Sequence, residues 1–156
     1  MNLSNACNIS SEKLQNFLKL YDIFHQNQKD WLLNSLKKCK SKWKFVIGHY
    51  PVISGGPHLI SNELSSFLLP LFKKYKVDFY ISGHDHNNQV LKKNNTIFLI
   101  SGGTSFNVMP KKIKETIFAT DKKGFLQLNT SLNKIDIEFV QPKNKNLLLF
   151  SSVKKY

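Results

Sequence analysis

The sequence predicts an α/β fold in which short strands that end in glycine and histidine alternate with amphipathic helices. Two runs of mainly β-branched and aromatic residues, 44–47 and 77–81, each lead into a Gly-His pair and indicate buried strands. An amphipathic stretch precedes each run, as expected for helices that pack on a sheet. With 156 residues and 41% apolar composition, the chain is long enough to bury one core.

The N-terminal part is expected to be helical after a polar, loop-like segment that extends to about Ser11. Residues 12–24 show apolar side chains at helical spacing, and residues 26–40 show a clearer amphipathic pattern with lysines on the polar face. These two stretches are treated as separate elements. The second of them leads into the first Gly-His strand.

A further helix is predicted between the two Gly-His strands. Ser61 or Asn62 can act as its N-cap, and the apolar residues up to Tyr75 recur three, four and seven positions apart. Pro70 falls within this pattern and is expected to kink or loosen the helix, because proline lacks the backbone N–H that the helix needs. The apolar face is predicted to pack on the sheet.

Strands and turns are predicted for the rest of the chain. Residues 89–91 and 96–100 read as strands around an Asn94-Asn95 turn, and residues 101–105 read as a glycine loop at the rim of the sheet. The basic segment 106–120 is expected to be irregular. Three final strands are predicted at residues 124–129, 134–140 and 146–152.

Three histidines follow the two Gly-His strands and form a candidate metal site. His49 comes directly after the first strand and its glycine, and His84 and His86 come after the second. Neutral imidazole is a good ligand for zinc, iron and manganese ions. Glycine before a histidine allows a sharp turn and keeps a Cβ atom away from an approaching ion or phosphate. The sequence therefore predicts that these imidazoles meet at one edge of the sheet.

The motifs Gly48-His49-Tyr50-Pro51-Val52 and Gly83-His84-Asp85-His86-Asn87 resemble the last two metal motifs of the calcineurin-like metallophosphoesterases. Within that family, the chain is most similar to the small purple (tartrate-resistant) acid phosphatases, and the resemblance runs through nearly the whole sequence. It implies the C-terminal half of a four-layer αββα sandwich. Residues 1–156 would form a partial calcineurin-like phosphoesterase domain, because Met1 falls just after a central strand of the family fold.

The resemblance also implies a function, the hydrolysis of phosphomonoesters by a metal-dependent phosphatase of the acid phosphatase type. Two metal ions are implied, Fe together with Fe, Zn or Mn. His49 and His84 would bind the divalent ion and His86 the second ion, which is iron(III) in the purple enzymes. His58 would hold the substrate or protonate the leaving group, and the alternative for His58 is an exposed loop histidine without such a role.

The other residues of the second motif have an implied supporting role. Asp85 and Asn87 are candidates for orienting the imidazoles by hydrogen bonds. The family's earlier motifs, which supply aspartates and a Gly-Asn-His element, have no counterpart in this chain. The implied partners are therefore a phosphomonoester substrate and the missing N-terminal half of the fold. The isolated chain is expected to show little or no activity, and to aggregate unless that half is supplied.

Two alternatives belong to other functional classes. The first is a catalytically inactive phosphatase-like scaffold or anchoring protein, against which the intact histidines argue. The second is a nucleic-acid-binding protein, suggested by the net charge of +13. All 23 basic residues are lysine and they are scattered along the chain, whereas base recognition favours arginine. No nucleic-acid partner is therefore expected.

Three features of the sequence bear on the compartment and on the state of the cysteines. The longest wholly apolar runs, such as 147–150, are too short to span a bilayer, so no transmembrane segment is expected. No signal peptide opens the sequence, while the resemblance implies a secretory or endolysosomal location. Related phosphatases hold a disulfide near the start of this region, to which Cys7 would contribute. Either Cys39 replaces the usual partner cysteine or both thiols stay free.

Overall fold

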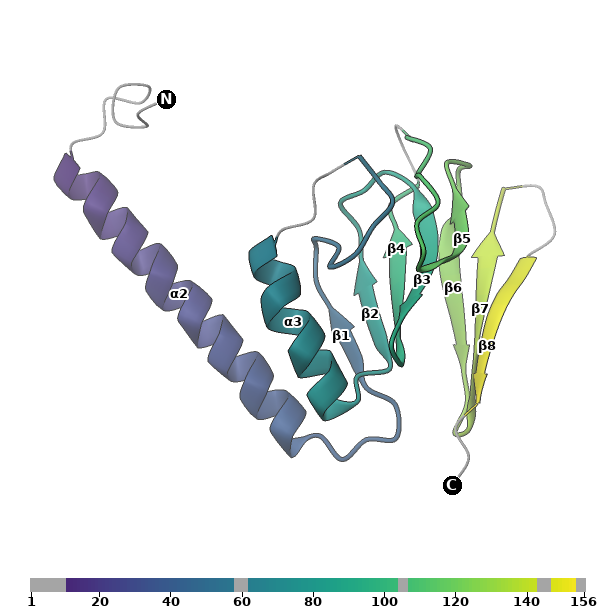
Figure 1. Ribbon diagram of the computed structural model, residues 1–156, viewed down its shortest axis with the longest axis horizontal. Coiled ribbons are helices and arrows are strands. Elements are labelled where there is room, and N and C mark those ends of the chain that lie inside the picture. Colours follow the sequence, from purple (N-terminus) through teal and green to yellow (C-terminus); the bar gives the residue numbers. More distant parts are fainter. Residues whose placement is uncertain (1–10, 58–61, 104–106, 143–146, 154–156) are drawn as a thin grey trace. The chain divides into compact units, whose positions relative to one another are not determined.

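The computed structural model describes residues 11–57, 62–103, 107–142 and 147–153 of the chain (Figure 1). The chain divides into two compact units between Lys40 and Ser41. In the described residues, the first unit is built on helix α2, and the second contains helix α3 and eight strands. Both Gly-His motifs lie in the second unit, which is therefore the part that positions the candidate metal site.

Helix α2 is one continuous element, Ser11–Lys38, where two helical stretches were predicted. Neither glycine nor proline occurs in this region, so nothing in the backbone chemistry ends the helix near residue 25. The rings of Tyr21 and His25, one helical turn apart, have centroids 4.2 Å from each other and pack across the expected break. In the part of the chain that the structure describes, neither helix has the length and hydropathy needed to cross a membrane.

A five-stranded mixed sheet forms the centre of the second unit. Its strand order is β1-β2-β4-β3-β5. Strands β1, β2 and β4 run parallel to one another, and β3 is antiparallel to both β4 and β5. The strands are β1 Phe45–Ile47, β2 Phe79–Ser82, β3 Asn88–Lys93, β4 Thr96–Ser101 and β5 Thr116–Thr120. Both predicted Gly-His strands are thus confirmed, as adjacent parallel strands.

The hairpin that joins β3 to β4 confirms the predicted Asn94-Asn95 turn. Lys93 pairs with Thr96 across it, so the turn contains only these two asparagines. Asn94 has a φ of 54°, a left-handed conformation that asparagine tolerates better than most residues. The local sequence was therefore sufficient to place this turn.

Strand β5 corrects the prediction that the whole segment 106–120 is irregular. Its residues pair antiparallel with β3, from Asn88 opposite Thr120 to Leu91 opposite Thr116, with a register shift between Val90 and Leu91. The lysines that suggested an irregular segment lie before the strand, whereas the strand itself is Thr-Ile-Phe-Ala-Thr. The β-branched and aromatic residues of this segment favour a strand, although lysines precede them in the sequence.

Helix α3, Asn62–Tyr75, covers one face of the sheet (Figure 1). Its buried residues Leu68, Leu71 and Phe72 face the strands, and the Phe72 ring lies 5.5 Å from that of Tyr80 on β2, between ring centroids. The helix continues through Pro70, which is exposed. The amphipathic pattern therefore predicted this helix correctly, while the expected kink or loosening at Pro70 stays a prediction.

A second sheet packs on the opposite face of the first (Figure 1). It consists of β6 Phe125–Thr130, β7 Lys134–Val140 and β8 Leu147–Val153, all antiparallel, which confirms the three predicted final strands. The core between the sheets contains Phe79, Val90, Ile97 and Leu99 from the first sheet and Leu126, Ile135, Ile137 and Phe139 from the second. The second unit is thus layered as helix, sheet and sheet, in agreement with the predicted α/β fold.

Strand β1 lies at one edge of the five-stranded sheet. Within the described residues it pairs with β2 alone. Phe45 is 38% exposed and stacks on Phe79 with a centroid distance of 5.1 Å, while Ile47 is 76% exposed. Apolar side chains on an unpaired edge strand favour pairing with a further strand.

Candidate metal centre

The parallel pairing of β1 and β2 brings the two Gly-His motifs side by side. The strands run in the same direction, so their carboxyl ends meet at one edge of the sheet. Two backbone hydrogen bonds continue the pairing beyond the strands: Gly48 N donates to Ile81 O at 3.0 Å, and Gly83 N donates to His49 O at 3.2 Å. These hydrogen bonds therefore fix the position of the segment after β1 relative to the segment after β2.

His49 and His84 meet at this edge. His49 Nε2 lies 3.2 Å from His84 Nδ1, and the two rings are nearly perpendicular, with a centroid distance of 5.1 Å. Zinc–imidazole bonds are about 2.0–2.1 Å long, so two nitrogens on one tetrahedral ion lie about 3.4 Å apart. The observed spacing fits two ligands of a single ion. The same distance is that of a hydrogen bond between the two rings, so metal binding by His49 and His84 stays a prediction.

The backbone turn at the second motif occurs at His84 rather than at the glycine before it. His84 has a φ of 59°, whereas Gly83 is not among the residues with positive φ. A Cβ atom on Gly83 would meet nothing within 4 Å. The expectation that glycine makes the turn is therefore wrong for Gly83. A non-glycine residue in the left-handed region carries conformational strain, which is often found at functional sites.

Packing against Tyr80 explains why residue 48 of the first motif is a glycine. A Cβ atom there would collide with the Tyr80 hydroxyl, which donates a hydrogen bond to Tyr50 O at 2.7 Å. Burial raises the pKa of Tyr80 to about 12, so this hydroxyl stays protonated as a donor well beyond neutral pH. Tyr80 thus fixes the backbone next to His49, a role that the sequence analysis did not assign to it.

The structure does not gather His86 with this pair. His86 is exposed, and its backbone oxygen accepts a hydrogen bond from Val108 N at 3.0 Å. His58 lies outside the described residues, as does Cys7. Across residues 11–57, 62–103, 107–142 and 147–153, no three His, Cys, Asp or Glu side chains are grouped in a way that would hold an ion. Metal binding by His86 and substrate contact by His58 stay predictions.

Asp85 and Asn87, which flank His86, are both completely buried. Ser54 Oγ donates a short hydrogen bond to Asp85 Oδ2, and Asn87 Nδ2 donates to Val108 O at 3.2 Å. Asn87 Oδ1 accepts from Gln89 Nε2 at 2.7 Å. The two side chains thus connect the histidine loop to neighbouring segments.

Ser54 and Gln89 are site residues that the sequence analysis missed. Gln89 is completely buried and Ser54 is nearly so, although both are polar. A signal was present, since the strand that begins at Asn88 opens with two polar residues before its apolar run. Polar side chains at inward positions of a central strand indicate a buried hydrogen-bond network.

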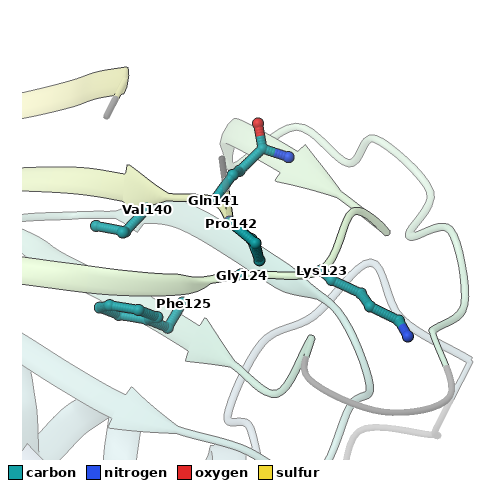
Figure 2. Close-up of a pocket in the computed structure, with 6 residues that line it drawn as sticks. All are labelled: Lys123, Gly124, Phe125, Val140, Gln141 and Pro142. Atoms are coloured by element: carbon teal, nitrogen blue, oxygen red, sulfur yellow. The ribbon is translucent and has the colours of Figure 1, made fainter. Parts of the chain in front are cut away.

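A pocket lies away from the histidine pair. Figure 2 shows this pocket of about 330 Å³ where β6 begins and β7 ends. Its lining residues are Lys123, Gly124, Phe125, Val140, Gln141 and Pro142. None of them is a His, Cys, Asp or Glu, so this pocket is not a metal site.

Comparisons with known proteins place the chain among phosphoesterases. A model of the calcineurin-like phosphoesterase family matches residues 4–88, which include both Gly-His motifs. Purple acid phosphatase 7 of Arabidopsis thaliana is 37% identical over 125 residues, covering 77% of this chain and 38% of that protein. The chain thus spans well under half of this relative.

Solved structures agree with the fold. A structure described as GAP50, the anchor in the inner membrane complex of Plasmodium, gives a TM-score of 0.72 at 31% identity, over 86% of this chain and 45% of its own. A purple acid phosphatase from yellow lupin seeds gives a TM-score of 0.71, over 83% of this chain and 28% of its own. At 18% identity, the lupin enzyme shows likeness of fold alone. Because the family model matches more than half of the chain and the fold agrees, this chain belongs to the calcineurin-like phosphoesterase family.

Proposed function

We propose that this chain is part of a metal-dependent phosphatase of the acid phosphatase type, which hydrolyses phosphomonoesters at a dinuclear metal centre. The observation that carries this proposal is the pair of imidazole nitrogens of His49 and His84, 3.2 Å apart at the carboxyl ends of two parallel strands. The similarity to purple acid phosphatases supports the same reaction. The proposed metals are iron together with iron, zinc or manganese.

The four histidines would fill three roles in the proposed reaction. His49 and His84 would hold the divalent ion through their neutral imidazole nitrogens, and His86 would hold the second ion. Bound metal ions polarise phosphoryl oxygens and lower the pKa of a bound water. His58 would donate a proton to the leaving oxygen or hold the phosphate. His84, with its left-handed φ of 59°, follows β2 after a single glycine.

The remaining ligands are proposed to come from a part of the protein outside residues 1–156. Two adjacent imidazoles do not complete a dinuclear site, which also needs bridging oxygen ligands. The chain covers 38% of the Arabidopsis relative and 45% of the Plasmodium structure, and β1 presents an unpaired edge in the described residues. Both observations support a domain of which this chain is the C-terminal half. By the same similarity, we propose a secretory or endolysosomal location.

Zinc binding to the full-length protein tests the histidine pair. His49→Ala and His84→Ala should each weaken Zn²⁺ binding at least about tenfold, because each removes a ligand and loss of a supporting residue alone has that effect. Isothermal titration calorimetry gives the dissociation constants. His25→Ala is the matched control, since His25 lies on α2 and has no proposed role. Equal affinities in all four proteins would refute the proposed site.

Turnover of a chromogenic phosphomonoester tests the reaction itself. The full-length protein should hydrolyse it, and His84→Ala should lose most of that activity. The isolated 156-residue chain should show little or none. Turnover by the pure chain that is abolished by His84→Ala would contradict the proposal that the other half supplies essential ligands.

A second candidate function is a catalytically inactive anchoring protein with the same fold. The similarity to the Plasmodium structure described as an anchor favours it specifically. Elemental analysis of the purified full-length protein distinguishes the two functions. About two metal ions per molecule together with turnover support the phosphatase, and a metal-free protein without turnover supports the anchor.

A further inference from the structure

A buried polar network joins the two loops that carry the histidine pair, and Gln89 lies at its centre. Gln89 Nε2 donates to Ser54 Oγ at 3.0 Å and to Asn87 Oδ1 at 2.7 Å, while Gln89 Oε1 accepts from Gly55 N at 2.9 Å. Gln89 is completely buried at the start of β3. Its amide therefore contacts both the segment that follows His49 and the segment that follows His84.

Ser54 links Gln89 by hydrogen bonds to Asp85, the residue between His84 and His86. Its hydroxyl donates to Asp85 Oδ2 and accepts from Gly56 N at 2.8 Å as well as from Gln89. Asp85 is completely buried. A buried carboxyl group is unfavourable unless hydrogen bonds compensate it, so its position is fixed by the donors around it.

The network is closely packed as well as hydrogen-bonded. A Cβ atom on Gly55 would collide with Lys111 O, and one on Gly56 would collide with the Asp85 carboxyl group. Lys111 N also donates to Gly55 O at 2.7 Å. The loop that follows His49 is thus confined between the histidine loop and the segment near Lys111, which leaves it little freedom to move.

We infer that Gln89 is a positioning residue, which fixes the loop of His84 and His86 against the loop that follows His49. This inference rests on the proposed function, because the arrangement it fixes is that of the proposed metal ligands. An apolar side chain of similar size would fill the same space. The three hydrogen bonds add a defined orientation of both loops, and supporting residues of this kind commonly set metal affinity.

Asn88 offers a matched control on the same strand. It is also completely buried, but its Nδ2 donates to Lys122 O at 3.3 Å and to Gly124 O at 3.4 Å, on a segment without histidines. Successive residues of a strand point to opposite faces of the sheet. Gln89→Met and Asn88→Leu therefore each remove a buried amide, and only the first removes one that contacts the histidine loops.

The experiment compares these two variants in the full-length protein by two measurements. The first is the set of histidine ring signals in nitrogen-15 NMR spectra of metal-free protein, and the second is the dissociation constant for Zn²⁺. Gln89→Met should shift the His49 and His84 ring signals and weaken Zn²⁺ binding about tenfold, whereas Asn88→Leu should do neither. Ser54→Ala removes one of the same hydrogen bonds and serves if Gln89→Met does not fold.

The outcomes separate this inference from the function on which it rests. Ring signals and Zn²⁺ affinity that change no more in Gln89→Met than in Asn88→Leu would overturn the inference and leave the phosphatase proposal standing. Shifted ring signals in a protein whose wild type binds no Zn²⁺ would support the positioning role and refute the proposed metal site.

Discussion

Two glycines near the histidine pair differ in what an added Cβ atom would meet. At Gly55 it would collide with a backbone oxygen, that of Lys111, while at Gly83 it would meet nothing within 4 Å. Gly55→Ala should therefore lower the free energy of unfolding by about 1–3 kcal/mol, as overpacking does. Gly83→Ala should change it by less than about 1 kcal/mol. Urea denaturation of the full-length protein measures both.

Turnover measurements on Gly83→Ala test whether the open space beside Gly83 has a functional role. If Gly83→Ala folds as well as the wild type but loses turnover, the open space beside Gly83 is needed by the ion or the phosphate. Equal losses of stability in the two variants would contradict the packing argument.

The raised pKa of Tyr80 predicts a loss of folding stability at alkaline pH. Its pKa is raised by burial from 10.0 to about 12, so between these values the folded state keeps a proton that the unfolded state releases. The stabilisation is complete below pH 10 and is lost as the pH rises through 12, by about 2–3 kcal/mol. Tyr80→Phe should remove this part of the pH dependence in urea denaturation, while losing about 1 kcal/mol at neutral pH with the hydrogen bond to Tyr50 O.

Single residues also show what sequence reasoning can reach. His49 and His84 were predictable as a pair, because each follows a strand and parallel neighbours end at the same edge. The separation of His86 from this pair was not predictable, since residues 84–86 lie outside the strands and His84 has a left-handed φ of 59°. The contacts of Gln89 with Ser54 cross 35 positions of sequence and depend on how a loop folds back.

At the scale of elements, helix α3 continues through an internal proline, Pro70. Pro70 is exposed in the interior of Asn62–Tyr75, where it can donate no backbone hydrogen bond. Pro70→Ala should raise the free energy of unfolding by about 1–3 kcal/mol, because alanine restores that donor and suits a helix interior. Thermal denaturation followed by circular dichroism measures the change.

Lys73→Ala on the same helix is the control, since Lys73 is exposed and alanine there alters only helix propensity. A Pro70→Ala variant no more stable than Lys73→Ala would mean that the surrounding structure already compensates the missing hydrogen bond.

Elements differed in how well periodicity predicted them. The amphipathic pattern placed α3 and the alternation placed β7, because in both the buried face is continuous. The division of α2 was wrong, since a change of apolar face is not a helix end without a breaking residue. Strand β5 was missed because it is short and follows a lysine-rich segment that has no strand pattern.

At the scale of the whole molecule, the exposed apolar side chains of β1 predict association of the isolated chain. Ile47 is 76% exposed on a strand whose outer edge is unpaired in the described residues. The 156-residue chain should form oligomers or aggregates in light scattering coupled to size-exclusion chromatography. Ile47→Lys should reduce this association, because charged residues on an edge strand oppose pairing.

Leu132→Lys is the matched control, since Leu132 is 69% exposed in the connection between β6 and β7 and lies on no strand edge. A chain that elutes as a monomer, or that responds equally to both substitutions, would show that the β1 edge does not drive association.

The family of the molecule was predictable from its two Gly-His motifs, because their order and strand context are more specific than either motif alone. The fold class followed from the alternation of strands and helices, and the helix–sheet–sheet layering of the second unit confirms it. The absence of the family's aspartate and Gly-Asn-His motifs predicted an incomplete site, and this stays a prediction. Metal ligands from distant parts of a protein meet only in the folded domain.

The meeting of His49 and His84 also has a consequence for folding thermodynamics. An ion held by both imidazoles would cross-link β1 to β2 across 35 positions of sequence, in the folded state only. Ligand binding to the folded state alone adds about 2.7 kcal/mol of stability when the free ion is at 100 times its dissociation constant. Metal supply would then raise the free energy of unfolding, so chelation would lower the midpoint of thermal denaturation as well as the turnover.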